Sequence, residues 1–372
     1  MRLDVWLPPV FSPLAETGSG RLLATRLQTF EGTNPSMSVE VRIRDEQGPG
    51  GLLETLSSAS LAAPAALPDV IALNPSALNT AALKGLVVSL NGLMPLPASP
   101  DWYDYAAAAA MVDEGYFGLP FASDAEAFAV RTSSYAATPR NWADLQLGSG
   151  PFAFPAADLT ASFTMAQYLA LGGELTNSDG LPSIAPKPLQ DILAFYVQAR
   201  TAGVLPMRIQ EEETTQEIWA DFEAGLIAGA HSPISHFLQT DIPGSTLVPI
   251  PTRDGQGIAL TQTWTWAIVT RDPSRQAAAS QLIAWLSAPE FLGPWTQRLG
   301  LLPPTRESLD QWPDEQWRAI ATRISLVGYP RPSDEILSIV GPVMQAAVEA
   351  VLSGMSSPAE AAREAAASLT AP

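Results

Sequence analysis

The sequence predicts an α/β protein with two domains, and three observations support this fold class. Short apolar runs alternate along the chain with segments of helical periodicity, which is typical of parallel sheets covered by helices. The chain has 372 residues, which is too many for one ordinary core and about right for two domains. Connecting segments rich in proline and glycine interrupt the alternation.

The first α/β stretch occupies residues 1–84. Leu23, Leu27 and Phe30 recur at helical spacing, and the helix that they predict stops where Gly32 and Pro35 follow. This part of the chain alternates regularly, which predicts a parallel sheet with helices on both faces. The expected elements are strands at 3–7, 38–43 and 68–73 and helices at 20–35, 51–61 and 76–84.

Residues 116–135 break this rhythm and predict a long extended connection. A second α/β stretch over about 125–250 follows the connection. A helix starts at residue 141, and a strand at 150–155 comes after it. The expected helices that complete this stretch lie at 159–173, 188–206 and 215–230.

The remaining chain starts with a connector that contains two prolines and two glycines, and then enters the strand TQTWTWAIV at 261–269. Two helices are expected over 274–309, followed by helices at 333–354 and 357–369. Ser357 and Glu360 form a predicted capping box at the start of the last helix.

Composition excludes several classes of function. The net charge of −18 repels nucleic acid and anionic lipid, so neither is an expected partner. The chain contains no cysteine, which excludes disulfides, thiolate metal sites and a cysteine nucleophile. No signal peptide is visible, and the longest apolar stretch, 106–112, is too short to span a membrane. The protein is therefore either cytosolic or has lost an export segment.

Motifs of catalysis are lacking in the sequence. It contains no G-x-S-x-G, no P-loop and no H-E-x-x-H, and its two histidines, His231 and His236, are five residues apart rather than three or four. We therefore expect no catalytic site, no metal site and no cofactor. Asp124 and Glu126 are two apart in an extended segment, roughly 6.5–7 Å from each other. That spacing permits a glycosidase pair, but we favour carboxylates that accept hydrogen bonds from ligand hydroxyls.

A set of motifs spread in order over nearly the whole chain resembles a known family. The segments are FEGTNPSMSVEVRI (30–43), GYFGLPFASDAEAFAV (115–130), WADFEAGLIAGAHSP (219–233), WAIVTRDPSRQAAASQLIAWLSAPE (266–290) and LGLLPPTRESL (299–309). In these segments the chain is similar to the extracellular solute-binding proteins of ABC importers, in the carbohydrate-binding branch that includes maltose-binding protein.

The resemblance implies a two-lobed periplasmic-binding-protein fold. Each lobe would be a mostly parallel sheet with helices on both faces, and crossing hinge strands would join the lobes and allow closure around a ligand. The N-terminal lobe would comprise 1–122 plus 256–302, and the C-terminal lobe 126–252 plus 306–372. The hinges would lie near 121–126, 249–257 and 301–306.

The resemblance also implies a function. The protein would be an extracytoplasmic, monomeric receptor that delivers an oligosaccharide or glycoside to the permease subunits of an ABC importer. It would lie either in the periplasm or on the outer face of the cell membrane, where a lipid anchor could hold it. A non-sugar solute such as a polyamine is the alternative ligand, and a glycoside-acting enzyme using Asp124 and Glu126 is the alternative of another class. The expected ligand-binding residues are Phe11, Glu16, Asn74, Asp124, Glu126, Asp158, Thr160, Ser162, His236, Trp264, Tyr329 and Arg331.

The two tryptophans of TQTWTWAIV are expected to differ in role. Strand geometry places Trp264 and Trp266 on one face. In sugar-binding relatives, a tryptophan stands where Trp264 does, so Trp264 would line the cleft and stack on the ligand. Trp266 would be the first core residue. On this interpretation, truncating Trp264 would weaken binding with little loss of stability, whereas truncating Trp266 would destabilise the fold.

Overall fold

The computed structural model describes residues 1–97 and 100–370 of the chain. The fold divides into two compact units. Unit 1 comprises Met1–Asp124 and Thr261–Ala321, and unit 2 comprises Ala125–Leu260 and Thr322–Pro372. The chain passes from one unit to the other inside two long strands, β6 (Leu119–Arg131) and β10 (Ala259–Ile268), and inside helix α13 (Glu315–Leu326).

The sheet of unit 1 is the one that the alternation predicts. Strand β1 (Arg2–Leu7) pairs in parallel with β2 (Ser38–Ile43) and with β3 (Val70–Leu73), and β10 runs antiparallel to β3. The strand order is β2-β1-β3-β10-β6. The helices of this unit are α1 (Gly18–Thr33), α2 (Leu52–Ala62), α3 (Pro75–Leu83), α4 (Asp104–Ala109), α10 (Pro273–Leu286), α11 (Pro289–Leu299) and α12 (Arg306–Asp310), and a small hairpin joins β4 (Met111–Val112) to β5 (Gly115–Tyr116).

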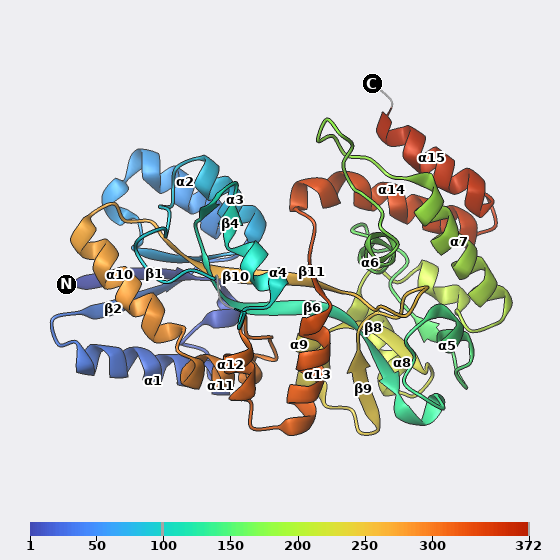
Figure 1. Ribbon diagram of the computed structural model, residues 1–372, viewed down its shortest axis with the longest axis horizontal. Helices are drawn as coiled ribbons and strands as arrows, with labels where there is room; N and C mark the ends of the chain where they lie inside the picture. The colour runs from blue at the N-terminus through green and yellow to red at the C-terminus, as the bar shows by residue number, and fades with distance from the viewer. Residues whose placement is uncertain (98–99, 371–372) are drawn as a thin grey trace. The chain divides into compact units, whose positions relative to one another are not determined.

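Alternation along the strands separates two cores in unit 1, because successive side chains point to opposite faces of a sheet. Val5, Trp266 and Ile268 pack with the residues of α1, α10 and α11. Trp6 and Ala267 pack on the opposite face with residues of α2 and α3. Figure 1 shows these helices on the two sides of β1 and β10. Helices on both faces of a mostly parallel sheet confirm the predicted α/β fold class.

Unit 2 has a smaller sheet, in which antiparallel pairs outnumber parallel ones among the described residues, so the mostly parallel sheet expected for this part of the chain is not found there. Strand β6 runs antiparallel to β8 (Gly229–Pro233) and to β9 (Ser245–Val248), and β7 (Phe152–Ala153) runs parallel to β8. A short strand, β11 (Gly328–Pro330), pairs with β10. The helices of unit 2 are α5 (Trp142–Gln146), α6 (Ser162–Ala170), α7 (Pro186–Thr201), α8 (Thr215–Glu223), α9 (Ile234–Thr240), α14 (Asp334–Leu352) and α15 (Pro358–Thr370).

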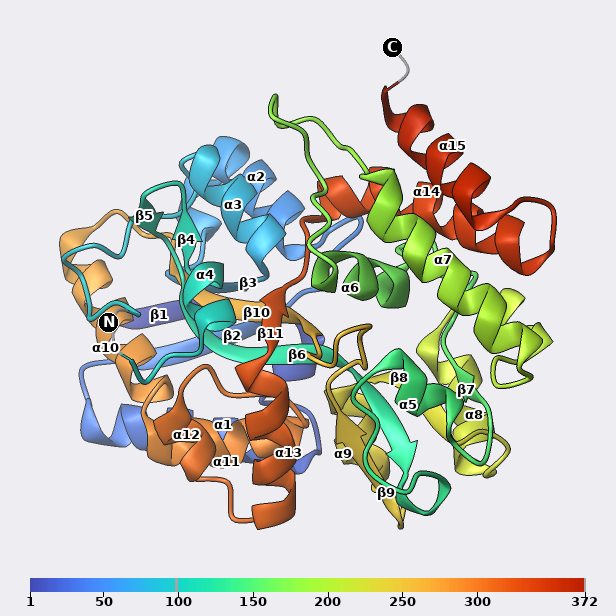
Figure 2. The same cartoon turned by 45° about the vertical axis from the view of Figure 1, so that its right-hand side comes forward.

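Helix α14 is long and apolar enough to cross a membrane when judged on length and composition alone. In unit 2 it contacts α6, α7 and α15, and Figure 2 shows α7, α14 and α15 side by side. Leu337, Val340 and Met344 are buried in these contacts. We therefore describe α14 as a core helix of unit 2.

The observed division of the chain differs from the expected lobes at two boundaries. Residues 306–321 belong to unit 1, although the resemblance placed them in the C-terminal lobe. The reason is packing between α11 and α12: a Cβ at Gly293 would lie 2.2 Å from the Ser308 carbonyl oxygen, and the Trp312 indole donates to Thr296. Residues 250–258 fold back as a bridge-paired turn inside unit 2 rather than forming a boundary.

Candidate functional site

Four polar side chains of unit 1 meet at the edge of the sheet where β1, β2 and β3 end. Asn74 directly follows β3, and Glu46 lies in the loop that follows β2. Strand β10 is antiparallel and pairs Thr265 with Leu73, so Gln262 and Trp264 reach the same edge. Loops at the carboxyl ends of parallel strands are the usual place for ligand sites in α/β folds.

Glu46 is the centre of this group. Its Oε1 accepts hydrogen bonds from Asn74 Nδ2 at 2.7 Å, Trp264 Nε1 at 3.1 Å and Gln262 Nε2 at 3.3 Å. Asn74 is itself held in place, because its Oδ1 caps α3 by accepting from the Ala77 amide at 2.9 Å. We call these four residues the Glu46 cluster. Three N–H donors on one oxygen leave the second carboxylate oxygen to other partners.

Sequence reasoning found Asn74 and Trp264 and missed Glu46 and Gln262. The available signal was positional: Glu46 follows the second predicted strand, as Asn74 follows the third. Gln262 lies two residues before Trp264 in β10, and its polar side chain reaches Glu46.

The expected contrast in burial between the two tryptophans is small. Trp264 is 8% exposed and Trp266 is 0% exposed, and both belong to one core cluster. They differ instead in their indole N–H groups. Trp264 donates to Glu46, whereas Trp266 Nε1 has no hydrogen-bond partner among the described residues. We therefore expect that truncating Trp264 would also cost stability, because this side chain is almost fully packed.

Phe11 is placed in the core. It is 1% exposed, and its ring packs edge-on against Phe121 at 4.9 Å and Trp264 at 5.3 Å. This ring has no exposed face on which a sugar could stack, so Phe11 supports Trp264 instead of contacting a ligand directly. Glu16 lies exposed in the loop before α1, where its backbone carbonyl accepts from Arg21.

In unit 2, the structure brings Asp158, Thr160 and Ser162 together at the start of α6. The Asp158 carboxylate accepts from the backbone amides of Thr160 at 2.8 Å and Ser162 at 3.0 Å, and from both hydroxyls at 2.8 Å. Ala161 between them adopts a left-handed conformation at φ 48°. These contacts satisfy the amide of Ser162, the first residue of α6, so the three residues are engaged mainly with one another.

The chain between Asp158 and Ser162 also packs closely against the interior of α14. A Cβ at Gly341 would lie 2.4 Å from the Leu159 carbonyl oxygen and 2.9 Å from Thr160 Cα. Only glycine permits this approach.

Glu126 and His231 form a close pair in the sheet of unit 2. Oε2 of Glu126 lies 3.0 Å from Nε2 of His231, and the side chains are 29% and 0% exposed, respectively. Sequence reasoning selected Glu126 but favoured His236 over His231. The histidine that lies beside Glu126 is therefore the buried His231, and not His236.

His236 lies on α9, where its ring packs 4.7 Å from Trp219 of α8. Burial lowers the pKa of the His236 imidazole, and the nearby Glu223 carboxylate partly offsets that effect. Tyr329 in β11 is 46% exposed, and Arg331 pairs with Asp334 at 2.9 Å. Asp124 is a partly buried residue of β6 in unit 1.

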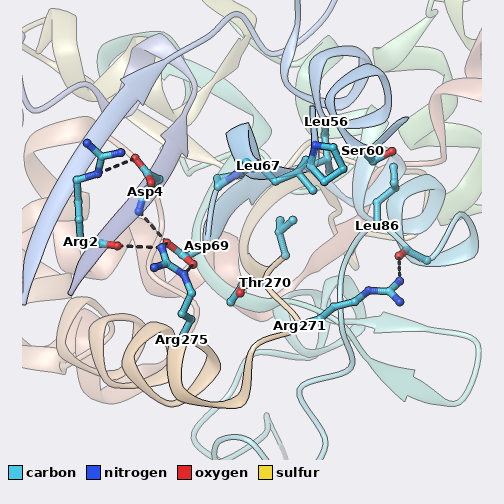
Figure 3. A pocket seen from close by; sticks show the side chains of 15 residues that line it. Arg2, Asp4, Leu56, Ser60, Leu67, Asp69, Leu86, Thr270, Arg271 and Arg275 are labelled. Carbon is cyan, nitrogen blue, oxygen red and sulfur yellow. Dashed lines mark hydrogen bonds and ion pairs between the residues drawn. The ribbon is translucent and has the colours of Figure 1, made fainter. Parts of the chain in front are cut away.

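A hollow of about 730 Å³ lies at the opposite edge of the unit 1 sheet, where β1 and β3 begin. Its charged residues are joined to one another: Arg275 donates to both carboxylate oxygens of Asp69 at 2.7 and 2.5 Å, and the Asp4 amide donates to Asp69 at 2.9 Å (Figure 3). Arg271 donates to the Gly85 carbonyl at 2.8 Å. These bonds tie β1, β3 and α10 together, which indicates a structural role.

Residues 25–322 match the family described as bacterial extracellular solute-binding protein. The match covers most of the chain. The chain belongs to this family. A comparison with curated protein sequences found no match.

The fold of this solute-binding protein is similar to that of several sugar-binding proteins of known structure. The sugar-binding protein MalE of Xanthomonas citri has a TM-score of 0.80 at 19% identity, over 99% of this chain and 96% of the other. The cyclic alpha-maltosyl-1,6-maltose binding protein of Arthrobacter globiformis has a TM-score of 0.77 at 16% identity, over 99% and 98%. The maltotriose-bound maltose/maltodextrin-binding domain of Bdellovibrio bacteriovorus has a TM-score of 0.68 at 19% identity, over 100% and 99%.

These comparisons confirm the expected periplasmic-binding-protein fold over the full chain. The solute-binding protein is a non-enzymatic receptor of an ABC importer, and its family is extracytoplasmic. Asp124 and Glu126 are therefore not a glycosidase pair. The membrane subunits of the importer are its expected partners by family.

Proposed function

We propose that this receptor binds a neutral carbohydrate, an oligosaccharide or a glycoside, and delivers it to its importer. The observation that carries the proposal is the Glu46 cluster, which combines a carboxylate, two side-chain amides and an indole at one edge of a sheet. Planar polar groups are suited to sugars, because carboxylates and amides pair with hydroxyls. Trp264 is packed in the core and contributes by holding Glu46.

The hydrogen bonds of Glu46 favour a neutral ligand over a polyamine. Oε1 of Glu46 already accepts from three uncharged N–H groups, so its second oxygen is the acceptor left for a ligand. An ammonium group can only donate, so it cannot accept a hydrogen bond from the amide N–H groups beside that oxygen. A sugar hydroxyl can donate to the second oxygen and accept from an amide nearby.

Further ligand contacts are proposed in both units. Asp124 and Glu126 in β6 supply carboxylates, and exposed Tyr329 supplies an aromatic ring. Arg331 and His236 are proposed as secondary contacts, as are Glu16, Asp158, Thr160 and Ser162. A lipid anchor stays a prediction, which mass spectrometry of the protein isolated from its own cells would test.

A thermal-shift screen tests the ligand class. The panel contains maltose, maltotriose, trehalose, sucrose, cellobiose and xylobiose, with spermidine and putrescine as cationic probes. A ligand at about 100 times its Kd adds roughly 2.7 kcal/mol to the stability of the folded state, which raises the melting temperature measurably. We expect a rise with at least one sugar and none with either polyamine. A rise with spermidine alone would contradict the proposal.

A further inference from the structure

The pair formed by Glu126 and His231 has a defined geometry. In the antiparallel pairing of β6 and β8, Phe128 lies opposite His231 and Glu126 lies opposite Pro233. Glu126 and His231 are therefore diagonal neighbours on one face of the sheet, within reach of each other. Their N···O separation of 3.0 Å is that of a hydrogen bond.

The surroundings of His231 are apolar. The ring of Phe163, in the first turn of α6, meets the imidazole edge-on at 5.3 Å, and Phe163 in turn contacts Phe128 at 6.1 Å. Among residues 1–97 and 100–370, neither ring nitrogen of His231 has an aligned hydrogen bond, and Oε2 of Glu126 has none either. The carboxylate oxygen at 3.0 Å is therefore the natural partner of Nε2.

Buried polar groups without partners cost free energy, so native proteins pair them. A proton on Nδ1 of His231 would be a buried donor facing no acceptor among the described residues, whereas a proton on Nε2 faces the Glu126 carboxylate. The arrangement thus favours a proton on Nε2 over one on Nδ1 alone.

The Glu126 side chain lies partly in the interior and partly at the surface. Its Oε2 is buried beside His231, while the side chain as a whole is 29% exposed. The exposure therefore belongs to the rest of the side chain. A carboxylate fixed at one oxygen can present the other to a ligand hydroxyl without losing much freedom on binding.

We propose that His231 is a positioning residue for Glu126. Its Nε2–H donates to Oε2 and orients the carboxylate, so that Oε1 accepts a hydrogen bond from a hydroxyl of the bound carbohydrate. The proposal rests on the proposed function for the role of Oε1. The pairing of His231 with Glu126 is independent of the ligand.

The first test is the tautomer of His231, measured by long-range ¹H–¹⁵N NMR of the imidazole nitrogens at neutral pH. The chain has two histidines, so a His236→Gln variant assigns both sets of signals. We expect the proton of His231 on Nε2 in the wild-type protein, and a mixture of tautomers in Glu126→Leu, which removes the acceptor. A proton on Nδ1, with none on Nε2, in the wild type would overturn the proposal.

The second test compares two substitutions of His231, with maltotriose as the probe in isothermal titration calorimetry. His231→Gln keeps an N–H donor near the position of Nε2, and His231→Leu removes it. We expect His231→Leu to raise Kd about tenfold or more, as loss of a hydrogen bond to a charged group does, and His231→Gln to stay close to the wild type.

Equal losses in the Gln and Leu variants, with unchanged melting temperatures, would indicate that His231 does not act through its donor. If maltotriose does not bind the wild-type protein, the thermal-shift panel supplies the sugar for this comparison. If no sugar binds, the proposed function fails, whereas the tautomer measurement still decides the pairing of His231 with Glu126.

Discussion

Glu46 shows how single residues define the candidate site in unit 1. Its Oε1 receives donors from two different strand ends and from the indole of Trp264, a residue 218 positions away along the chain. The donors fix the carboxylate before any ligand arrives, which lowers the entropy lost on binding. Trp264 has two roles in this arrangement: it packs in the core and holds Glu46.

Phenylalanine substitutions separate these two roles. Trp264→Phe and Trp266→Phe each remove part of a packed side chain, and each should lower the free energy of unfolding by about 1–3 kcal/mol. The first variant also removes a donor from Glu46, so the Kd for the bound sugar should rise several-fold. Chemical denaturation and calorimetry measure both quantities. Equal affinity losses in the two variants would refute a special role for the Trp264 N–H.

His236 makes folding stability depend on pH. Its pKa is lowered in the folded protein by burial, so the unfolded chain binds the proton first as the pH falls. The stability that this residue contributes is complete above about pH 6.5 and is lost as the pH falls toward the folded pKa. The wild type should therefore lose more stability than His236→Gln between about pH 8 and pH 5.5. Urea denaturation of both proteins at the two pH values measures this difference. Equal losses of stability in the wild type and in His236→Gln would contradict the prediction.

Asn74 was predicted because it directly follows a recognisable strand, and Glu126 because it lies two residues from Asp124 in an extended segment. The structure gives both of them polar partners. His231 could not be predicted, because its contact with Glu126 depends on the register between β6 and β8, which places the two residues diagonally opposite each other. Phe11 was misjudged because a loop residue after a strand can still turn inward, as its contacts with Phe121 and Trp264 show.

At the scale of elements, an ion pair joins strands to a helix in unit 1. Asp69 is buried, and Arg275 of α10 binds it with two hydrogen bonds while also donating to the Arg2 carbonyl. Arg275→Met leaves a buried carboxylate without its cation, so it should cost about 3 kcal/mol. Arg271→Met is the control in the same hollow: this exposed side chain donates to one carbonyl, and its loss should cost less than about 1 kcal/mol. Similar losses of unfolding free energy in the two variants, measured by chemical denaturation, would contradict this account.

Glycine determines how closely α14 approaches the chain ahead of α6. Gly341→Ala would place a methyl group against the Leu159 carbonyl, so we expect a loss of about 1–3 kcal/mol in unfolding free energy. A methyl group at Gly32 of α1 would meet no described atom within 4 Å, so Gly32→Ala should be neutral or stabilise by up to about 1 kcal/mol. Thermal unfolding of both variants checks the contrast. A neutral Gly341→Ala would show that α14 can shift freely.

Elements with strong periodicity or clear caps were predictable. The capping box of the last helix is present, with the Glu360 carboxylate accepting from the amide and hydroxyl of Ser357. Strand β7 spans two residues where six were expected, because pairing with β8 is limited to Phe152 and Ala153. Helix α13 was missed, although Trp317, Ile320 and Ile324 recur at helical spacing.

At the scale of the whole molecule, the sequence predicted two α/β units and the family, but not which segments join which unit. Residues 306–321 join unit 1 through close packing on α11, and no local pattern indicates such a choice. The net charge of −18 is compatible with either a neutral sugar or a polyamine, since a strongly acidic protein can attract a cation. The local bonding of Glu46 argues for a neutral ligand despite that charge.

Salt dependence tests the central claim most directly. Isothermal titration of the wild-type receptor at about 20 mM and about 500 mM NaCl would use spermidine and the sugar that gives the largest thermal shift, because screening weakens charged pairs and leaves neutral ones largely unaffected. The account predicts that the sugar binds with a Kd that changes less than about twofold between the two salt concentrations. Binding of spermidine that weakens with salt, together with no heat from any sugar, would contradict it.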